Sequence, residues 1–128
     1  MKRYLIDSSA VSKYLEERFP ETGLQFMDDL FGQESLISVI TQIELLSWNP
    51  ADRDLENKVA TFVEDSVVPE LSEEIVLETI RLRRKHKIKT PDAIIAATAL
   101  VYGRTVVTDN ERDFDNIKGP KWINPTRL

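Results

Sequence analysis

Acidic side chains recur in four separate segments of this sequence, and each of them stands beside an apolar run. The acids are Asp7, Glu44, Asp92 and, in the last segment, Asp109 and Asp113. Carboxylates that gather at one place repel each other unless a cation lies among them, and Mg²⁺ or Mn²⁺ takes ligands that are all oxygen atoms. A metal ion held in this way lowers the pKa of a bound water and orients it for attack on phosphorus. If the fold brings the acids together, the chemistry that they indicate is phosphodiester hydrolysis.

Two of these acids also have purely structural explanations. Glu44 follows Thr41 by three residues, which is the spacing of a capping box, in which the glutamate bonds to the backbone of its own helix. Asp92 follows Thr90 and Pro91, and this order predicts an N-cap, a proline at the first helical position and an acid at the second. An acid at that position interacts favourably with the helix macrodipole. Both explanations remain open on the sequence alone.

Asp7 is harder to explain as a structural acid. It closes the apolar segment 3–6 and is followed by Ser8 and Ser9, whose hydroxyls can cap the next helix and leave its carboxylate free for another role. The single histidine, His86, stands at a predicted helix end beside lysines. It cannot build a histidine metal site, and we assign it no catalytic role.

One segment concentrates positive charge just before Asp92. Its side chains could hold phosphates near a metal ion, or they could be the solvated end of a helix, and both interpretations remain open. The candidates for phosphate contacts are Arg84, Lys85, Lys87 and Lys89. The net charge of the whole chain is -5, which argues against binding of nucleic acid by general electrostatics. Any nucleic-acid contact must therefore be local.

Short apolar segments that alternate with amphipathic helices must position these acids. Strands are expected at residues 3–6, 35–40, 66–69 and 105–108, and the helices include Glu21–Phe31, Ala51–Asp65, Ser72–His86 and Ala93–Tyr102. This alternation predicts an α/β fold with a parallel sheet that is covered on both faces. In such sheets ligands bind outside the carboxyl ends of the strands, which is where the acids fall.

Length and composition limit the organisation of the protein. A chain of 128 residues fits one domain over residues 1–128, and a hydrophobic content of 41% is that of a soluble globular protein. The absence of cysteine excludes a disulfide framework and a cysteine zinc site, and it suits a reducing cytoplasm. The N-terminal segment lacks the apolar run of a signal peptide, and no uncharged run approaches the roughly 20 residues that cross a bilayer. We therefore expect a cytoplasmic protein that does not span a membrane.

Four blocks of the sequence together resemble PIN domains, particularly VapC-like toxins. The blocks are Tyr4-Leu-Ile-Asp7-Ser-Ser, Ile40-Thr-Gln-Ile-Glu44-Leu, Thr90-Pro-Asp92-Ala-Ile-Ile-Ala-Ala-Thr-Ala and Val106-Val-Thr108-Asp-Asn-Glu-Arg-Asp113-Phe. They span essentially the whole chain in the order of the family, and the third block is the most specific. The resemblance implies a PIN-like three-layer α/β/α sandwich around a central, mainly parallel sheet of four or five strands.

The resemblance also implies a metal-dependent endoribonuclease. Asp7, Glu44 and Asp92 match the core acidic ligands of Mg²⁺ or Mn²⁺ in the family, which bind the metal directly or through water. VapC-like toxins are ribonucleases that usually form homodimers, and each is silenced by a cognate antitoxin whose tail occupies the acidic groove. The implied substrate is therefore RNA, and the implied partners are an antitoxin protein and a second copy of the chain.

The family block after the last core strand leaves a choice for the fourth acid. Asp113 matches the acid of a common Asp-Phe pair and is our choice, while Asp109 and Asn110 are the alternatives. Ser8 and Thr108 match polar positions that orient the acids without binding metal themselves. Two other functions remain open, namely a PIN nuclease that processes RNA or DNA without an antitoxin, and a catalytically silent PIN domain that only binds a partner.

Overall fold

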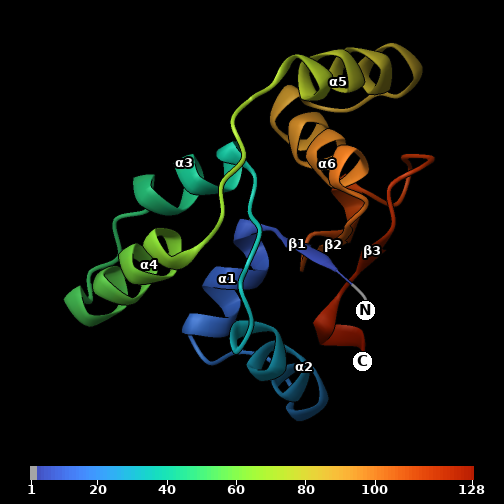
Figure 1. Cartoon of the computed structure of the whole chain (residues 1–128). Coiled ribbons are helices and arrows are strands. Elements are labelled where there is room, and N and C mark those ends of the chain that lie inside the picture. Colours follow the sequence, from blue (N-terminus) through green and yellow to red (C-terminus); the bar gives the residue numbers. More distant parts are fainter. Residues whose placement is uncertain (1–2) are drawn as a thin grey trace.

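The computed structural model describes residues 3–128, and Figure 1 shows the path of the chain. The elements in chain order are β1 Tyr4–Ile6, α1 Ser8–Leu15, α2 Glu21–Phe31, α3 Val39–Ser47, α4 Arg53–Asp65, α5 Glu73–Lys85, α6 Thr90–Tyr102, β2 Thr105–Val107, η1 Glu111–Asp113, β3 Trp122–Ile123 and η2 Pro125–Arg127. Residues 1 and 2, which the expected single domain includes, lie outside the described residues.

The sheet is parallel and contains three strands in the order β1-β2-β3. Leu5 pairs with Val106, and Val106 pairs with Trp122. On the other side of β1, Leu36 pairs with Leu5 and Val67 pairs with Leu36 through single parallel bridges. The sheet is thus mainly parallel as expected, but it has three strands rather than four or five. The two further strands that the sequence predicts are reduced to one bridging residue each, Leu36 and Val67.

The strand predicted over residues 35–40 is cut short because the next helix begins earlier than expected. The Ser38 hydroxyl accepts a hydrogen bond of 3.1 Å from the N–H of Thr41, and α3 begins at Val39. An N-cap hydroxyl satisfies one of the first N–H groups of a helix, which otherwise have no partner within the helix. This local bond outweighs the β preference of the branched residues Val39 and Ile40.

The last two helices begin close to the expected residues. Ser72 caps α5 by accepting a hydrogen bond of 3.3 Å from the N–H of Ile75. Helix α6 begins at Thr90, the residue expected to be its N-cap, so that Lys89 is the N-cap instead. It ends at Tyr102, and the C-cap residue Gly103 has a φ of 62°, a conformation that glycine adopts without strain. The longest helices among residues 3–128 have 13 residues, and none is both long and apolar enough to cross a membrane.

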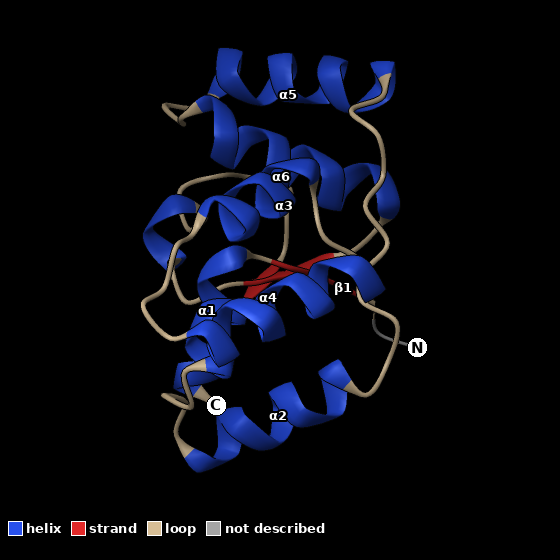
Figure 2. Cartoon of the chain, turned by 90° about the vertical axis from the view of Figure 1, so that its left-hand side faces the viewer, coloured by secondary structure: helices blue, strands red, loops and turns tan. Residues whose placement is uncertain are grey.

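The sheet lies between two helical layers, as Figure 2 shows. Consecutive residues of a strand point to opposite faces of the sheet. Ile6 and Val107 accordingly pack in one core with residues of α1, α2 and α4, whereas Leu5 and Val106 pack in a second core with residues of α5 and α6. This is the three-layer α/β/α arrangement that the sequence predicts. Because β1 and β2 are parallel neighbours, the residues that follow both strands meet at one edge of the sheet.

Candidate functional site

Asp7 lies at the end of β1 and is the N-cap residue of α1, but its side chain makes no cap hydrogen bond. Instead, its Oδ2 atom accepts hydrogen bonds of 2.8 Å from the hydroxyls of both Ser9 and Thr108. The residue is only 6% exposed, and burial raises the pKa of its carboxyl. The two hydroxyl bonds and the Ser8 backbone lower the pKa, while the charge of Asp113 raises it further. The carboxylate is therefore held in place by hydroxyls that the next helix does not use for capping.

Glu44 lies beyond the first turn of α3, so it cannot be the glutamate of a capping box for that helix. Ser38 is the N-cap, and the Glu44 side chain accepts a hydrogen bond of 3.0 Å from the Ser8 hydroxyl of α1. Burial raises the pKa of Glu44, the bond from Ser8 lowers it, and the charges of Asp7 and Asp113 raise it. The structure removes the capping explanation and places this carboxylate within electrostatic reach of Asp7.

Asp92 lies in the first turn of α6, where an acid interacts favourably with the helix macrodipole. Its pKa is nevertheless raised to about 6, first by burial and then by the charges of Asp113, Asp7 and Glu44, while Lys89 lowers it. The favourable interaction with the helix macrodipole therefore remains, but desolvation and repulsion from three other carboxylates have the larger effect on the pKa of Asp92. This repulsion shows that the four acids share one electrostatic environment.

Asp113 ends the short helix η1, and the Asn110 side-chain amide donates a hydrogen bond to its Oδ2 atom. Its charge raises the pKa of each of the other three acids. The structure therefore brings together the four acids that the sequence singled out, from the end of β1, from two helices and from the segment after β2. In residues 3–128 no three of these side chains approach closely enough to form a finished set of metal ligands.

Asp109 is drawn away from this cluster by other partners. Its Oδ1 atom accepts hydrogen bonds of 3.1 Å from the Lys13 ammonium and of 2.7 Å from the Thr126 hydroxyl. Asn110 contacts Asp113 through its amide rather than joining the acids as a carboxylate. Of the three candidates in this segment, Asp113 is therefore the one that the structure places with Asp7, Glu44 and Asp92.

Three hydroxyls support the acids, and the sequence analysis found two of them. Ser8 bonds to Glu44, and Thr108 is fully buried against Asp7. Ser9 was missed as a site residue, although it donates to Asp7 and accepts a hydrogen bond of 3.0 Å from the backbone N–H of Asp109. A hydroxyl two residues after an acid that ends a strand is the signal that could have identified it.

The basic segment is divided between the site and the solvent. Lys89 lowers the pKa of Asp92 and so lies within electrostatic reach of the acids. The other candidate phosphate contacts are all exposed at the end of α5 and in the loop that follows it, namely Arg84, Lys85 and Lys87. His86 is the residue that caps the end of α5, and none of the four acids belongs to that helix.

The donor chemistry of the acid cluster fits a hard divalent cation. All four side chains offer carboxylate oxygens. Among the charges that shift the pKa of Asp92, Lys89 supplies the one positive charge. Mg²⁺ usually keeps several of its waters and binds one or two carboxylates directly, so a cluster whose members are near but not in ligand contact suits it. A cation would also relieve the repulsion that raises the pKa values of Asp7, Glu44 and Asp92.

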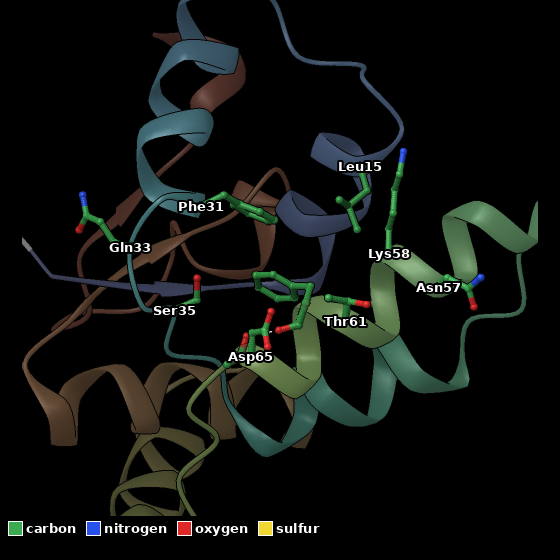
Figure 3. Close-up of a pocket in the computed structure, with 10 residues that line it drawn as sticks. Leu15, Phe31, Gln33, Ser35, Asn57, Lys58, Thr61 and Asp65 are labelled. Atoms are coloured by element: carbon green, nitrogen blue, oxygen red, sulfur yellow. Dashed lines mark hydrogen bonds between the residues drawn. The ribbon is translucent and has the colours of Figure 1, made fainter.

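A groove of about 610 Å³ lies between α1 and α3, and Glu44 is the one of the four acids that lines it. The groove is lined by Ser8, Ser9, Ser12, Glu16, Glu44, Leu45, Ser47 and Trp48. A separate hollow of about 390 Å³ lies between α1, α2 and α4, where the rings of Phe31 and Phe62 stack 4.7 Å apart (Figure 3). None of the four acids lines that hollow, so the groove is the part of the surface that belongs to the candidate site.

Comparison with known proteins is consistent with this geometry. A family model described as PIN domain matches residues 4–120. The structure of DNA-bound VapBC from Salmonella typhimurium matches with a TM-score of 0.80 and 22% identity, over 98% of this chain and 99% of that chain. A toxin-antitoxin complex from Klebsiella pneumoniae matches with a TM-score of 0.75 and 24% identity, over 95% of this chain and 97% of that chain.

VapBC-1 from nontypeable Haemophilus influenzae matches with a TM-score of 0.76 and 22% identity, over 96% of this chain and 98% of that chain. At these identities the likeness to the solved structures shows a shared fold. No curated protein matches the sequence significantly.

Proposed function

Because this chain belongs to the PIN domain family, we propose that it is an endoribonuclease that depends on Mg²⁺ or Mn²⁺. In this proposal it acts as the toxin of a VapBC-type toxin-antitoxin pair. The observation that carries the proposal is that Asp7, Glu44, Asp92 and Asp113 arrive from four separate segments of the chain at one place. Burial and the charges of the other three acids raise the pKa of Asp92 to about 6. Such a cluster of like charges is costly for the fold and is typical of a site built for a cation.

The proposed ligands are Asp7, Glu44, Asp92 and Asp113. When bound, Mg²⁺ or Mn²⁺ would supply a water of lowered pKa and charge stabilisation for the departing oxygen. Ser9 and Thr108 orient Asp7 through Oδ2, and Ser8 orients Glu44.

The ends of the products follow from the residues available. The sequence contains one histidine, and it caps α5, so a histidine pair for attack by the RNA 2′-hydroxyl is not available. We therefore expect cleavage by water that leaves 5′-phosphate and 3′-hydroxyl ends. Products with 2′,3′-cyclic phosphate ends would contradict this mechanism.

The groove between α1 and α3 is the proposed path of the RNA strand. It begins at Glu44 and Ser8 and is lined by hydroxyls and by the half-buried Trp48, on which a base can stack. Among the described residues that line it there is no lysine or arginine, so we expect phosphate contacts to come from the metal and from Lys89. Binding that depends on few cations is consistent with the net charge of -5 and predicts a shallow dependence of affinity on salt.

The likeness to VapBC complexes supports an antitoxin as the natural partner. We propose that a cognate antitoxin covers the acidic groove, that the chain forms a homodimer and that it acts in the cytoplasm. A small antitoxin gene next to the gene of this protein would support the toxin function. Its absence, together with RNA cleavage, would favour a PIN nuclease that processes RNA or DNA on its own.

The proposed function is tested with purified protein and a pool of structured and single-stranded RNAs, with a matched DNA pool. Each reaction is run with Mg²⁺, with Mn²⁺ and with EDTA, and repeated with Asp7→Asn, Asp92→Asn and the exposed control Asp115→Asn. We expect RNA cleavage that requires metal, is lost in the first two variants and persists in the control. Inactivity on every substrate, with no binding of Mn²⁺, would favour the catalytically silent binding domain.

A further inference from the structure

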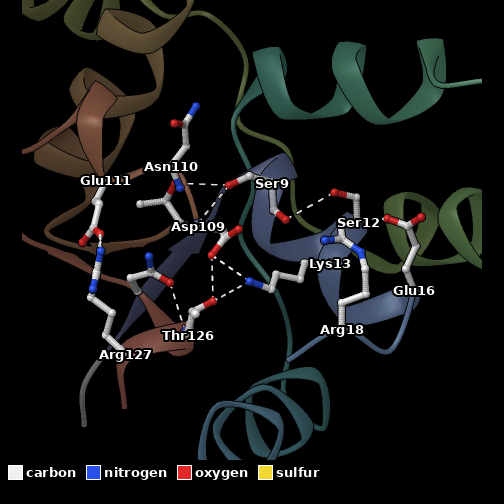
Figure 4. Close-up of polar contacts among 12 residues, drawn as sticks. Ser9, Ser12, Lys13, Glu16, Arg18, Asp109, Asn110, Glu111, Thr126 and Arg127 are labelled. Atoms are coloured by element: carbon white, nitrogen blue, oxygen red, sulfur yellow. Dashed lines mark hydrogen bonds and ion pairs between the residues drawn. The ribbon is translucent and has the colours of Figure 1, made fainter. Parts of the chain in front are cut away.

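The side chain of Lys13 is engaged inside the molecule although it belongs to a helix beside the groove. Only 13% of the side chain is exposed, and its ammonium donates to Asp109 Oδ1 at 3.1 Å and to the Thr126 hydroxyl at 2.7 Å (Figure 4). The ammonium also lies 5.1 Å from the centre of the Phe19 ring. A lysine held by these contacts is not a solvated cation that is free to bind phosphate.

Asp109 is held at both its side chain and its backbone. Its Oδ1 accepts a hydrogen bond from Thr126 as well as from Lys13, and its N–H donates to the Ser9 hydroxyl at 3.0 Å. Ser9 and Lys13 are four residues apart in α1, so they lie on the same face of that helix. Ser9 and Lys13, on one face of α1, thus both bind Asp109, the residue at the start of the loop that carries Asp113.

The C-terminal segment holds the same loop at a second point. Thr126 and Arg127 lie in η2, where the Asn124 side chain accepts a hydrogen bond from the N–H of Thr126. Arg127 forms an ion pair with Glu111, which stands two residues before Asp113. The family match ends at residue 120, so this second contact comes from a part of the chain that lies outside the match.

We propose that Lys13 is a positioning residue of the candidate site. By pairing with Asp109, together with Thr126, it fixes the loop 109–113 so that Asp113 faces Asp7, Glu44 and Asp92. This inference rests on the proposed metal-dependent nuclease, and it assigns Asp109 to the scaffold rather than to the metal.

The physical reason is the cost of leaving a carboxylate without its partner. Without the ammonium, the partly buried Asp109 can regain solvation only by moving, and its backbone is the start of the loop that carries Asp113. Removing the charge of Asp109 as well abolishes that drive, since an asparagine at this position still accepts the hydrogen bond from Thr126. The loss caused by changing Lys13 should therefore be reversed by a second change, which no direct contact between Lys13 and RNA would produce.

The test compares Lys13→Met, Asp109→Asn and the double variant with the unaltered protein. Methionine keeps an unbranched side chain over Phe19 and removes only the ammonium. Mn²⁺ affinity is measured by titration calorimetry without RNA, and backbone hydrogen exchange is followed across residues 109–117. We expect Lys13→Met to weaken Mn²⁺ binding about tenfold and to speed exchange in the loop, because partners of ligand-bearing elements typically contribute that much. In the double variant, Mn²⁺ affinity and the rate of hydrogen exchange in the loop should both return most of the way to the values of the unaltered protein.

Two further variants keep the result interpretable. Arg18→Met removes a cation from an exposed ion pair with Glu16, and it should leave both quantities unchanged. Thr126→Val leaves the ion pair intact and removes one hydroxyl, so it should cause a smaller loss in the same direction even if Lys13→Met does not fold.

Normal Mn²⁺ affinity and loop exchange in Lys13→Met, or a double variant no better than Lys13→Met, would overturn the proposal. If the unaltered protein binds no Mn²⁺ and cuts no RNA, the proposed function fails separately. Hydrogen exchange in the loop then still decides whether Lys13 holds it, because that measurement requires neither metal nor substrate.

Discussion

The Ser8 hydroxyl donates a hydrogen bond of 3.0 Å to the Glu44 carboxylate and joins two residues that are 36 positions apart in the chain. Ser8 is the first residue of α1 and directly follows Asp7. The end of β1 therefore positions the Asp7 carboxylate and also the hydroxyl that orients Glu44. The bond lowers the pKa of Glu44 against the effects of burial and of the neighbouring acids, which raise it. It therefore favours the ionised form of Glu44, which is the form that binds a cation.

The first prediction concerns this bond. Ser8→Ala should raise the pKa of Glu44 further and should lower kcat/KM on RNA about fivefold, since a hydrogen bond of this kind contributes about 1 kcal/mol. Glu44→Gln should be much more severe because it removes the charge itself. Ser66→Ala is the matched control, because that hydroxyl bonds to the backbone oxygen of Phe62 and does not line the groove. Equal losses in the two serine variants would show that the bond to Glu44 has no special role.

A second prediction concerns Thr108, which is fully buried. Its hydroxyl donates to Asp7 and accepts a hydrogen bond of 2.9 Å from the N–H of Asn110. Thr108→Val preserves the shape of the side chain but leaves the N–H of Asn110 without this acceptor. We expect the free energy of unfolding in urea to fall by about 1 to 3 kcal/mol and Mn²⁺ affinity to fall as well.

Thr108→Ser should retain most of both properties because it keeps the hydroxyl. Thr79→Val is the control on α5, where the hydroxyl donates only to the backbone oxygen of Ile75 in its own helix. It should leave Mn²⁺ affinity unchanged. A Thr108→Val variant with unaltered stability and affinity would contradict the role given to this hydroxyl.

A third prediction concerns pH and follows from Asp92. Its pKa is about 6 in the folded chain and 3.8 as the ordinary value, so between these values the folded chain binds more protons than the unfolded one. Stability from this group is therefore fully present below the lower value and is lost as pH rises through about 6. Without metal, urea unfolding should show a more stable protein at about pH 5 than at about pH 7.5.

Asp92→Asn tests the assignment because it removes this titration. The variant without metal should lose part of the pH dependence of its stability, and it should be more stable than the unaltered protein near neutral pH. Saturating Mg²⁺ should reverse the trend in the unaltered protein, because metal binding requires deprotonated carboxylates. An unaltered pH dependence in Asp92→Asn would show that other groups cause it.

A fourth prediction concerns the contact between α2 and the C-terminal segment. A Cβ atom on Gly23 would overlap the backbone oxygen of Pro125, so Gly23→Ala must displace η2 or the helix. We expect a loss of about 1 to 3 kcal/mol in thermal or urea unfolding. Gly32→Ala is the control, because the nearest atom to its added Cβ is the oxygen of Asp29 at 3.4 Å. Similar stability in the two variants would argue against close packing at Gly23.

Much of the fold follows from local patterns along the chain. The alternation of strands and helices, including the helices expected over residues 72–86 and 93–102, was predicted from spacing and residue type and is present. The extent of the strand at residues 35–40 was wrong, because a single side-chain bond from Ser38 starts α3 early. Residue preferences cannot show which of two competing local structures will obtain the better hydrogen bond.

For the candidate site, residue type and order along the chain were sufficient to single out Asp7, Glu44, Asp92 and the segment that holds Asp109 and Asp113, since parallel strands place their carboxyl ends at one edge. The family resemblance then favoured Asp113 within that segment. Only the tertiary structure showed that Asp109 is bound by Lys13 and Thr126, which reach it from positions 96 and 17 residues away. The tertiary structure alone also showed that the Ser9 hydroxyl donates a hydrogen bond to Asp7 and does not cap a helix. A sequence records which groups are present, but which partner a carboxylate meets depends on how distant segments pack, and that is decided when the chain folds.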